Sequence, residues 1–195
     1  MLEEEYAPRR KLPPHLRKPP APEAPFAYSI RDAVETDLPY VREIYNYYVR
    51  NSTVTFDEKP VTLKALRSKF GHVKKLGFPY LVAESPSGTI LGYAFVYPWR
   101  EKAAYRYTVE LSIYLGAAST GKGLGKALMA ELIERSRAAG IRELIAVIAD
   151  RGADASIAMH KAFGFEEIGR MGKVGFKFDR WLGTVLMQKS IKKRG

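Results

Sequence analysis

The chain has 195 residues, enough for one domain with its own hydrophobic core. Lysine and arginine outnumber aspartate and glutamate by 32 to 21, so the formal net charge of +11 attracts polyanions such as nucleic acid or a phosphate-rich cofactor. The absence of cysteine excludes disulfides and thiolate metal ligands, and with only three histidines we expect no metal site. The sequence has no apolar run as long as a membrane span and no secretory leader, so we expect a cytoplasmic protein without a membrane partner.

Proline content separates the start of the chain from the rest. Seven of the 12 prolines lie in residues 1–27, and such a composition favours an extended or disordered tail. Because this segment holds five Lys and Arg against four Glu, a charge of +10 remains on the other residues. We therefore expect a tail at 1–27, a folded domain at 28–191 and a basic C-terminal end at 192–195.

From Tyr28 onward, side-chain patterns of period two and period 3.6 alternate along the chain. In chain order they predict a strand at 28–33, a helix at 37–49 capped by Thr36, a β-prone stretch at 51–56, a helix from Thr62 to Gly77, a hairpin of strands 80–85 and 90–99, a strand at 107–115, a helix at 121–137, a strand at 143–149, a helix at 153–163, and strands at 165–174 and 184–190. This order predicts an α/β domain with a mixed sheet flanked by helices.

A glycine-rich turn lies between the strand at 107–115 and the helix that follows it. Gly121, Gly123 and Gly125 allow a ligand to approach the backbone closely, and the first N–H groups of a helix favour an anion. Lys122 and Lys126 add positive charge. The spacing matches neither a P-loop nor a dinucleotide-binding fingerprint. Taken alone, the turn indicates either a phosphate site or a tight structural turn.

Residues 119–125 resemble the acetyl-CoA pyrophosphate loop of the GNAT N-acetyltransferase superfamily, although Thr120 stands where that family usually has Gln or Arg. Residues 153–165 resemble the late helix of the superfamily, and His160 in place of the usual Tyr is typical of the phosphinothricin (methionine sulfoximine/sulfone) N-acetyltransferase branch. Residues 51–56, 97–100, 105–110 and 175–181 also resemble that branch. The resemblance covers about residues 28–191 and implies a GNAT-type sheet that splits between its fourth and fifth strands.

The resemblance also implies which residues hold the donor, acetyl-CoA, with no metal involved. The backbone of Ile113, Tyr114 and Leu115 would pair with the pantetheine arm. The pyrophosphate would lie against the loop formed by Thr120, Gly121, Lys122, Gly123, Leu124, Gly125 and Lys126.

Glu110 is the candidate general base. Val109, Leu111, Ile113 and Leu115 point to one face of their strand, so Glu110 lies on the opposite face among aromatic residues. An amine attacks a thioester only when it is neutral, and a buried carboxylate has a raised pKa suited to accepting its proton. The resemblance gives this Glu the same role. His160 is the second candidate, either as a packed residue or as a donor of a proton to the departing thiolate.

The acceptor's carboxylate needs a cation, and Arg100, Lys102, Lys173, Lys177 and Arg180 are available. The resemblance favours Arg100, Lys102, Tyr105 and Tyr114 around the acceptor, and Phe56 could shape an apolar pocket. The resemblance predicts direct acetyl transfer to the α-amine of a small amino acid or analogue, such as phosphinothricin, methionine sulfoximine or methionine sulfone. The alternatives are a GNAT enzyme for another amine (a peptide N-terminus, a polyamine or an aminoglycoside) and, more distantly, a basic nucleic-acid-binding protein.

The branch generally forms homodimers, and residues 176–181 could make that contact. We expect no specific nucleic-acid partner.

Overall fold

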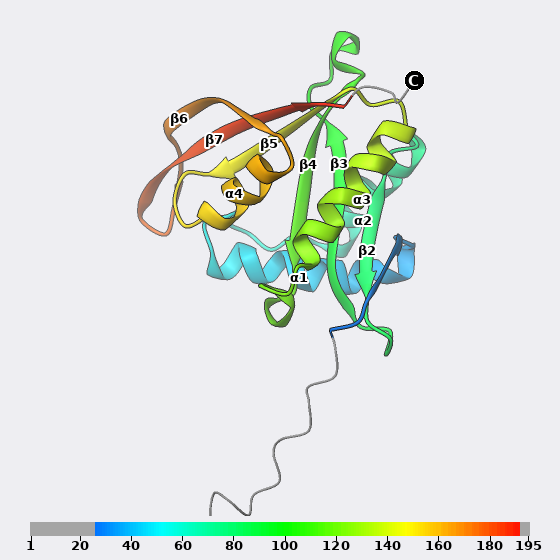
Figure 1. Cartoon of the computed structure of the whole chain (residues 1–195). Helices are drawn as coiled ribbons and strands as arrows, with labels where there is room; N and C mark the ends of the chain where they lie inside the picture. The colour runs from blue at the N-terminus through cyan, green and yellow to red at the C-terminus, as the bar shows by residue number, and fades with distance from the viewer. Residues whose placement is uncertain (1–25, 192–195) are drawn as a thin grey trace, which may run out of the picture.

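The computed structural model describes residues 26–191, which form one mixed sheet with helices on both faces (Figure 1). The sheet has seven strands in the order β1-β2-β3-β4-β5-β7-β6. The strands are β1 (Ser29–Asp32), β2 (Tyr80–Glu84), β3 (Ile90–Pro98), β4 (Thr108–Leu115), β5 (Glu143–Ala149), β6 (Glu166–Lys177) and β7 (Arg180–Ser190). The helices are α1 (Leu38–Asn51), α2 (Leu63–Lys75), α3 (Leu124–Ala138) and α4 (Asp154–Ala162), with short 3-10 turns η2 (Glu35–Asp37), η3 (Ala103–Tyr105) and η4 (Ala117–Ser119). The predicted tail and C-terminal end lie outside the described residues, except for Phe26 and Ala27.

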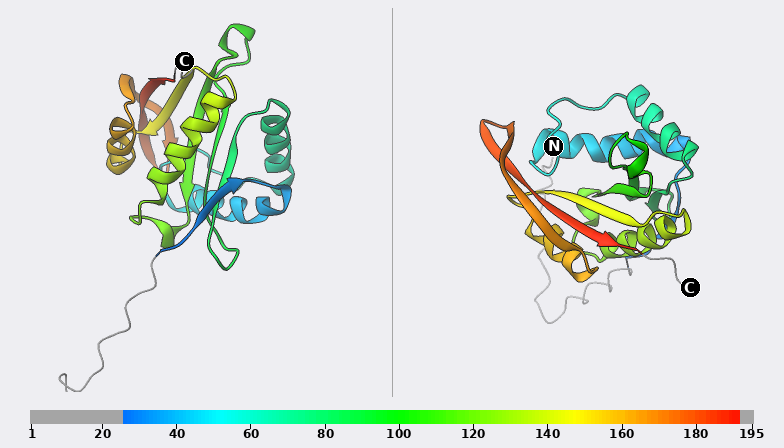
Figure 2. Two further views of the ribbon diagram at one scale, coloured as in Figure 1. Left: turned by 45° about the vertical axis from the view of Figure 1, so that its right-hand side comes forward. Right: turned by 90° about the horizontal axis from the view of Figure 1, so that it is seen from above.

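Two apolar layers hold the sheet between its helices. In Figure 2, α1 and α2 cover one face, while α3 and α4 cover the other. Under α3, the fully buried Val109 packs with Leu128, Leu132 and other apolar side chains. On the opposite face, Leu38 packs with a layer that includes Tyr80 and Tyr93. The alternation predicted for 107–115 is confirmed, because Val109 and Leu111 are in the α3 layer. No helix within residues 26–191 is long and apolar enough to cross a membrane.

The structure corrects three details of the sequence prediction. Residues 51–56 form no strand: Asn51 ends α1, and residues 52–56 belong to the loop that follows it. Thr36 caps no helix; Asp37 stands at the N-cap of α1, and its carboxylate accepts a hydrogen bond from the Val34 N–H. Strands β6 and β7 are longer than predicted and reach a tight turn in which Phe178 and Asp179 have φ of 51° and 57°. The irregular register near Gly175 obscures the period-two pattern in this hairpin.

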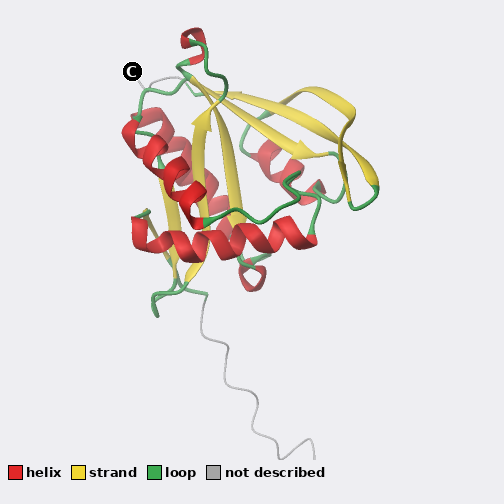
Figure 3. Ribbon diagram, turned by 180° about the vertical axis from the view of Figure 1, so that it is seen from behind, coloured by secondary structure: helices red, strands yellow, loops and turns green. Residues whose placement is uncertain are grey.

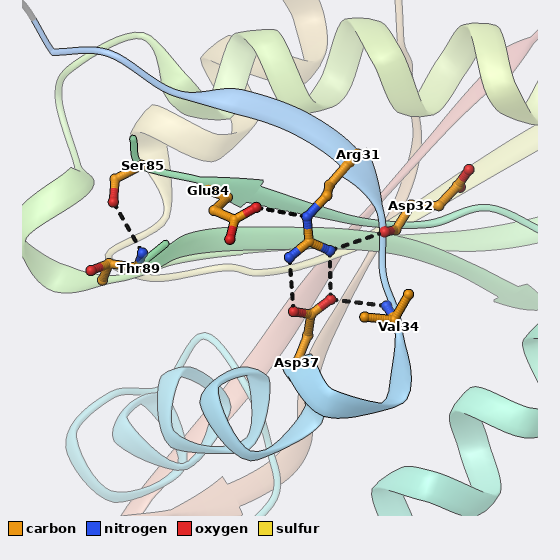
Figure 4. A network of polar contacts seen from close by, with 7 residues as sticks. All are labelled: Arg31, Asp32, Val34, Asp37, Glu84, Ser85 and Thr89. Carbon is orange, nitrogen blue, oxygen red and sulfur yellow. Dashed lines mark hydrogen bonds and ion pairs between the residues drawn. The ribbon is translucent and has the colours of Figure 1, made fainter. Parts of the chain in front are cut away.

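A buried carboxylate attaches the edge strand to the first helix (Figure 4). The Arg31 guanidinium on β1 donates to both oxygens of Asp37, at 2.7 and 2.9 Å, and to Glu84 on β2 at 2.7 Å. Burial alone would raise the pKa of Asp37, but the hydrogen bonds from Arg31 and from the Val34 N–H outweigh it, and the pKa is lowered. The network therefore joins β1, β2 and η2 through one guanidinium.

We expect Arg31→Met to lower the free energy of unfolding at pH 7 by about 1–3 kcal/mol, because the buried Asp37 carboxylate loses both hydrogen bonds from the guanidinium and keeps only that from the Val34 N–H. A group whose pKa is depressed in the folded protein stabilises above its unfolded pKa, and this contribution is lost as pH falls through the folded value. Urea unfolding should therefore show a smaller difference between variant and parent near pH 3 than at pH 7. Arg67→Met, which breaks an exposed ion pair with Glu35, is the matched control and should change stability little. An equal effect of both substitutions would contradict the assignment.

Candidate active site

Strands β4 and β5 pair only at their beginnings. The register joins Thr108 to Glu143, Val109 to Leu144 and Glu110 to Ile145, and it then stops. Beyond that point β4 continues along β3 as far as Leu115, whereas β5 continues along β7 as far as Ala149. The backbone of Ile113, Tyr114 and Leu115 therefore has no strand neighbour on this side within the described sheet. This confirms the predicted split between the fourth and fifth strands.

The chain leaves β4 through a turn that places main-chain N–H groups at the same end of the split. Gly121 and Gly123 have φ of 73° and 81°, a conformation that favours glycine, and Gly123 is the N-cap of α3. The helix begins at Leu124 rather than at Gly121, so the first two glycines belong to the turn itself. A Cβ at Gly125 would lie 3.4 Å from Met159 Sδ on α4, which shows how closely α3 packs there.

The polar residues of this turn are fixed to different degrees. Thr120 turns its hydroxyl inward to donate to the Ala117 carbonyl at 3.0 Å. Lys122 is exposed and its ammonium lies 4.8 Å from the centre of the Phe26 ring. Lys126 is exposed on the first turn of α3. Free helix N–H groups and two lysines make this end of the split attractive to an anion.

Glu110 lies where the two strands separate. Its side chain is partly buried and points to the face covered by α1 and α2, where Tyr97 is its partner across β3 and β4. Burial raises the pKa of Glu110, and the positive charges of Lys69 and Arg100 oppose that shift. The Arg100 guanidinium lies over the Trp99 ring at 4.3 Å, in the loop between β3 and β4.

Aromatic side chains form the floor beside Glu110. The half-buried Tyr114 ring lies 5.2 Å from Tyr45, 5.5 Å from Tyr48 and 5.4 Å from Tyr93 between ring centres. The Tyr45 hydroxyl donates to Asp57 Oδ2 at 2.7 Å, and burial is the main cause that raises its pKa to about 12. The Tyr48 hydroxyl donates to the Leu115 carbonyl at 2.7 Å. Helix α1 therefore supplies part of the floor and reaches the end of β4.

The loop after α1 is held against the β6–β7 hairpin, beside which it runs in Figure 3. The Lys177 ammonium donates to the carbonyls of Ser52 at 2.9 Å and Thr55 at 2.8 Å, and the side chain is almost fully buried. A Cβ at Gly175 would lie 2.5 Å from the Phe56 ring, so this contact requires glycine. Lys177, one of the cations available to an acceptor in the sequence, thus serves the loop backbone instead.

His160 is buried inside α4 and packs edge-on against Phe165, with ring centres 5.0 Å apart. Its Nδ1 lies 2.7 Å from the Ser156 carbonyl, which can only accept, so Nδ1 carries the hydrogen. Burial lowers the pKa of His160 despite the Ser156 carbonyl, so the ring is neutral near pH 7. Its buried Nε2 is then an acceptor, and it has no hydrogen-bond partner among the described residues.

The remaining sequence candidates are at the rim, and one site residue was missed. Lys102 and Tyr105 are exposed in the β3–β4 loop, around the turn η3. The missed residue is Lys69 on α2, whose charge acts on Glu110. Lys69 lies three residues after the buried Leu66 on α2, and this spacing places it at the edge of the helix face that packs on the sheet. The sequence does not show, however, that α2 packs against β3.

The sequence of this chain is similar to a known protein family and to proteins of known activity. Residues 30–186 match the family described as acetyltransferase (GNAT) domain. A phosphinothricin N-acetyltransferase of Alcaligenes faecalis is 38% identical over 92% of this chain and 95% of its own length. An L-methionine sulfoximine/L-methionine sulfone acetyltransferase of Pseudomonas paraeruginosa is 44% identical over 84% of this chain and 94% of its own.

A solved structure also superposes on this fold. A GNAT superfamily phosphinothricin acetyltransferase of Sinorhizobium meliloti, determined in complex with AcCoA, is 44% identical. The match covers 84% of this chain and 88% of the other, with a TM-score of 0.80.

We expect Lys177→Met to destabilise the protein by about 1–3 kcal/mol, because two buried carbonyls lose their donor. Amide hydrogen exchange should also become faster in residues 52–57 than elsewhere. Lys173→Met removes an exposed lysine of the same strand and should leave both measurements near those of the parent. Unchanged exchange in the loop of the Lys177 variant would show that the hairpin does not hold it.

Proposed function

The chain belongs to the GNAT acetyltransferase family and is an acyltransferase, and on this premise we propose that it moves the acetyl group of acetyl-CoA to the α-amine of a small amino acid or analogue. Phosphinothricin, methionine sulfoximine and methionine sulfone are the acceptors named for its relatives. The observation that carries the proposal is the position of Glu110, a partly buried carboxylate where β4 leaves β5. The cytoplasmic location expected from the sequence is part of the same proposal.

The residues present fit the donor, which would supply an acetyl thioester. The edge of β4 at Ile113, Tyr114 and Leu115 would lie along an extended amide-containing arm, with the Leu115 carbonyl already bound by the Tyr48 hydroxyl. The positive φ of Gly121 and Gly123 exposes the backbone before α3 to a pyrophosphate, close to Lys122, Leu124, Gly125 and Lys126. Thr120 is uncharged and its hydroxyl is bound to the Ala117 carbonyl. The helix N-terminus and the two lysines must therefore balance the charge of the pyrophosphate.

Glu110 has the environment that a general base for an amine requires. An amino acid arrives mostly as an ammonium, which has no lone pair, so a proton must leave before the nitrogen can attack. Glu110 accepts that proton, directly or through a water molecule. The nitrogen then forms a bond to the acetyl carbon while the carbon–sulfur bond breaks. The nitrogen loses its second proton as the amide forms, and the departing sulfur takes up that proton. The raised pKa of Glu110 brings the carboxylate closer to the operating pH.

The acceptor is assigned to the face that carries Glu110. Arg100, whose charge acts on Glu110, and Lys102 supply positive charge for the acceptor's carboxylate from the β3–β4 loop, which also carries Tyr105. Tyr114 forms the floor, and Phe56 stands on the loop held by Lys177. His160 is given no proton to donate, because its one hydrogen is bound to Ser156 and its ring is neutral.

The test is release of free thiol from acetyl-CoA by the full chain, with methionine sulfone, methionine sulfoximine, phosphinothricin, the standard amino acids, a peptide and spermidine as separate acceptors. We expect turnover with the first three. Glu110→Gln should lower kcat/KM by about 10²–10⁴-fold, the usual range for loss of a general base, and leave acetyl-CoA binding intact. For the parent, kcat/KM should fall on acidification at a pH above the ordinary range of a glutamate, since the base must be ionised.

Glu101→Gln removes an exposed carboxylate nearby and is the control, with activity near that of the parent. Turnover with the peptide or spermidine alone would keep the family and overturn the acceptor. Retained activity in Glu110→Gln would overturn the base.

The same proposal includes a homodimer formed through the β6–β7 hairpin. Large apolar side chains on its surface are between 42% and 56% exposed, namely Ile168, Met171, Val174, Phe176, Phe178 and Trp181. Phe176 and Trp181 are register partners with ring centres 5.4 Å apart. Several exposed large apolar side chains on one hairpin are typical of an association site. A second copy of the chain would cover it.

Light scattering after size-exclusion chromatography should therefore give twice the chain mass for the parent. Combined Phe176→Glu and Trp181→Glu substitutions should give a monomer, because two charges cannot be buried unpaired at an interface. Tyr40→Glu changes an exposed aromatic residue on α1 and should leave the dimer intact. A monomeric parent across the concentration range would refute the proposed assembly.

A further inference from the structure

Helix α2 places one cation above the floor of the acceptor face. The Lys69 ammonium lies 4.5 Å from the centre of the Phe95 ring and 5.2 Å from that of Tyr97. Both rings project from β3 on the side that also carries Glu110, because Tyr97 and Glu110 are cross-strand partners. The amine is therefore held by two aromatic faces next to the carboxylate assigned as the base.

Lys69 is open to a ligand. Together with Ala65, Ser68, His72 and Tyr97 it lines a surface hollow between α2 and the end of β3. Its side chain is exposed as a whole, and none of the ion pairs found within residues 26–191 involves it. Burial lowers the pKa of Lys69, and the negative charges of Glu110 and Asp57 oppose that shift without a carboxylate at contact distance. The hollow thus contains a positioned ammonium with no anion against it.

Glu110 has a cation from two directions. Lys69 comes from α2, and Arg100 comes from the β3–β4 loop. An α-amino acid has an ammonium and a carboxylate on the same carbon atom, so its two charges lie close together. A carboxylate with cations beside it is complementary to that pair of charges, whereas a polyamine would bring a second positive charge to Lys69.

We propose that Lys69 binds the α-carboxylate of the acceptor and so determines that the enzyme selects amines with an adjacent acidic group. This inference rests on the proposed function, because it assigns the acceptor's amine to Glu110. In the bound acceptor the ammonium faces Glu110 and the carboxylate accepts a charge-assisted hydrogen bond from Lys69. The rings of Phe95 and Tyr97 hold the lysine in place before the acceptor arrives, which reduces the entropy lost on binding.

The test compares methionine sulfone with its α-carboxamide, which keeps the amine and the side chain but lacks the negative charge. Lys69→Met removes the charge and keeps an apolar chain against the rings. We expect it to lower kcat/KM for methionine sulfone by about tenfold or more, mainly through KM, as for loss of a hydrogen bond to a charged group. For the carboxamide, Lys69→Met should change kcat/KM by less than about twofold, because this acceptor has no negative charge for Lys69 to bind. Lys69→Arg should restore most of the preference for the acid.

The two acceptors differ in the pKa of their amines, so the quantity compared is the ratio of their kcat/KM values in the variant and in the parent. The difference in amine pKa affects both ratios equally. Lys64→Met, which removes an exposed lysine from the same helix, should leave the preference unchanged. Loss of activity toward both acceptors by the same factor in Lys69→Met would reduce Lys69 to packing or to its charge effect on Glu110, and would overturn the inference, as would an unchanged preference. A parent that acetylates peptides or spermidine but no amino acid would overturn the proposed function itself, and the inference with it.

Discussion

The separation of β4 from β5 after Glu110 is the constraint on which the rest of the site depends. Each strand continues along a different neighbour, β4 along β3 and β5 along β7, so within residues 26–191 neither strand has a strand partner across the gap. An unpaired strand edge inside a sheet is costly unless another group covers it. The same divergence leaves a carboxylate at its vertex. The gap between the strands and the partly buried carboxylate at its end therefore arise from one event in the topology.

Electrostatics on the acceptor face are a balance between burial and nearby cations. Burial favours the neutral form of Glu110, while Lys69 and Arg100 favour the carboxylate. The cations stand on different elements, α2 and the β3–β4 loop, so the balance exists only in the folded protein. The neighbouring tyrosines are held neutral by burial, with the pKa of Tyr45 raised to about 12. On this face burial raises the pKa of Glu110, while Asp57 accepts a hydrogen bond from the Tyr45 hydroxyl.

The sequence predicted the order of elements because most of them have a single clear period. The strand at 143–149 matches β5 in full, and the alternation in β4 identifies the face of Glu110 from the sequence alone. Local patterns failed where long-range contacts decide the structure. Residues 51–56 have β-prone side chains, but Lys177 binds their carbonyls from a distant hairpin. Lys69 was missed for the same reason, since its contacts with Phe95 and Tyr97 depend on how α2 packs across the sheet.

The two sides of the split are made of different kinds of atoms. The edge of β4 beyond Glu110 and the turn at Gly121 and Gly123 present main-chain groups, whose chemistry is the same whatever side chains flank them. The opposite face presents side chains from α1, α2, β3 and β4, which substitution alters one at a time. Sequence drift can therefore reshape one half of the gap while the other half stays chemically constant. A fold built in this way can exchange one reaction partner for another through successive point mutations without rebuilding its framework.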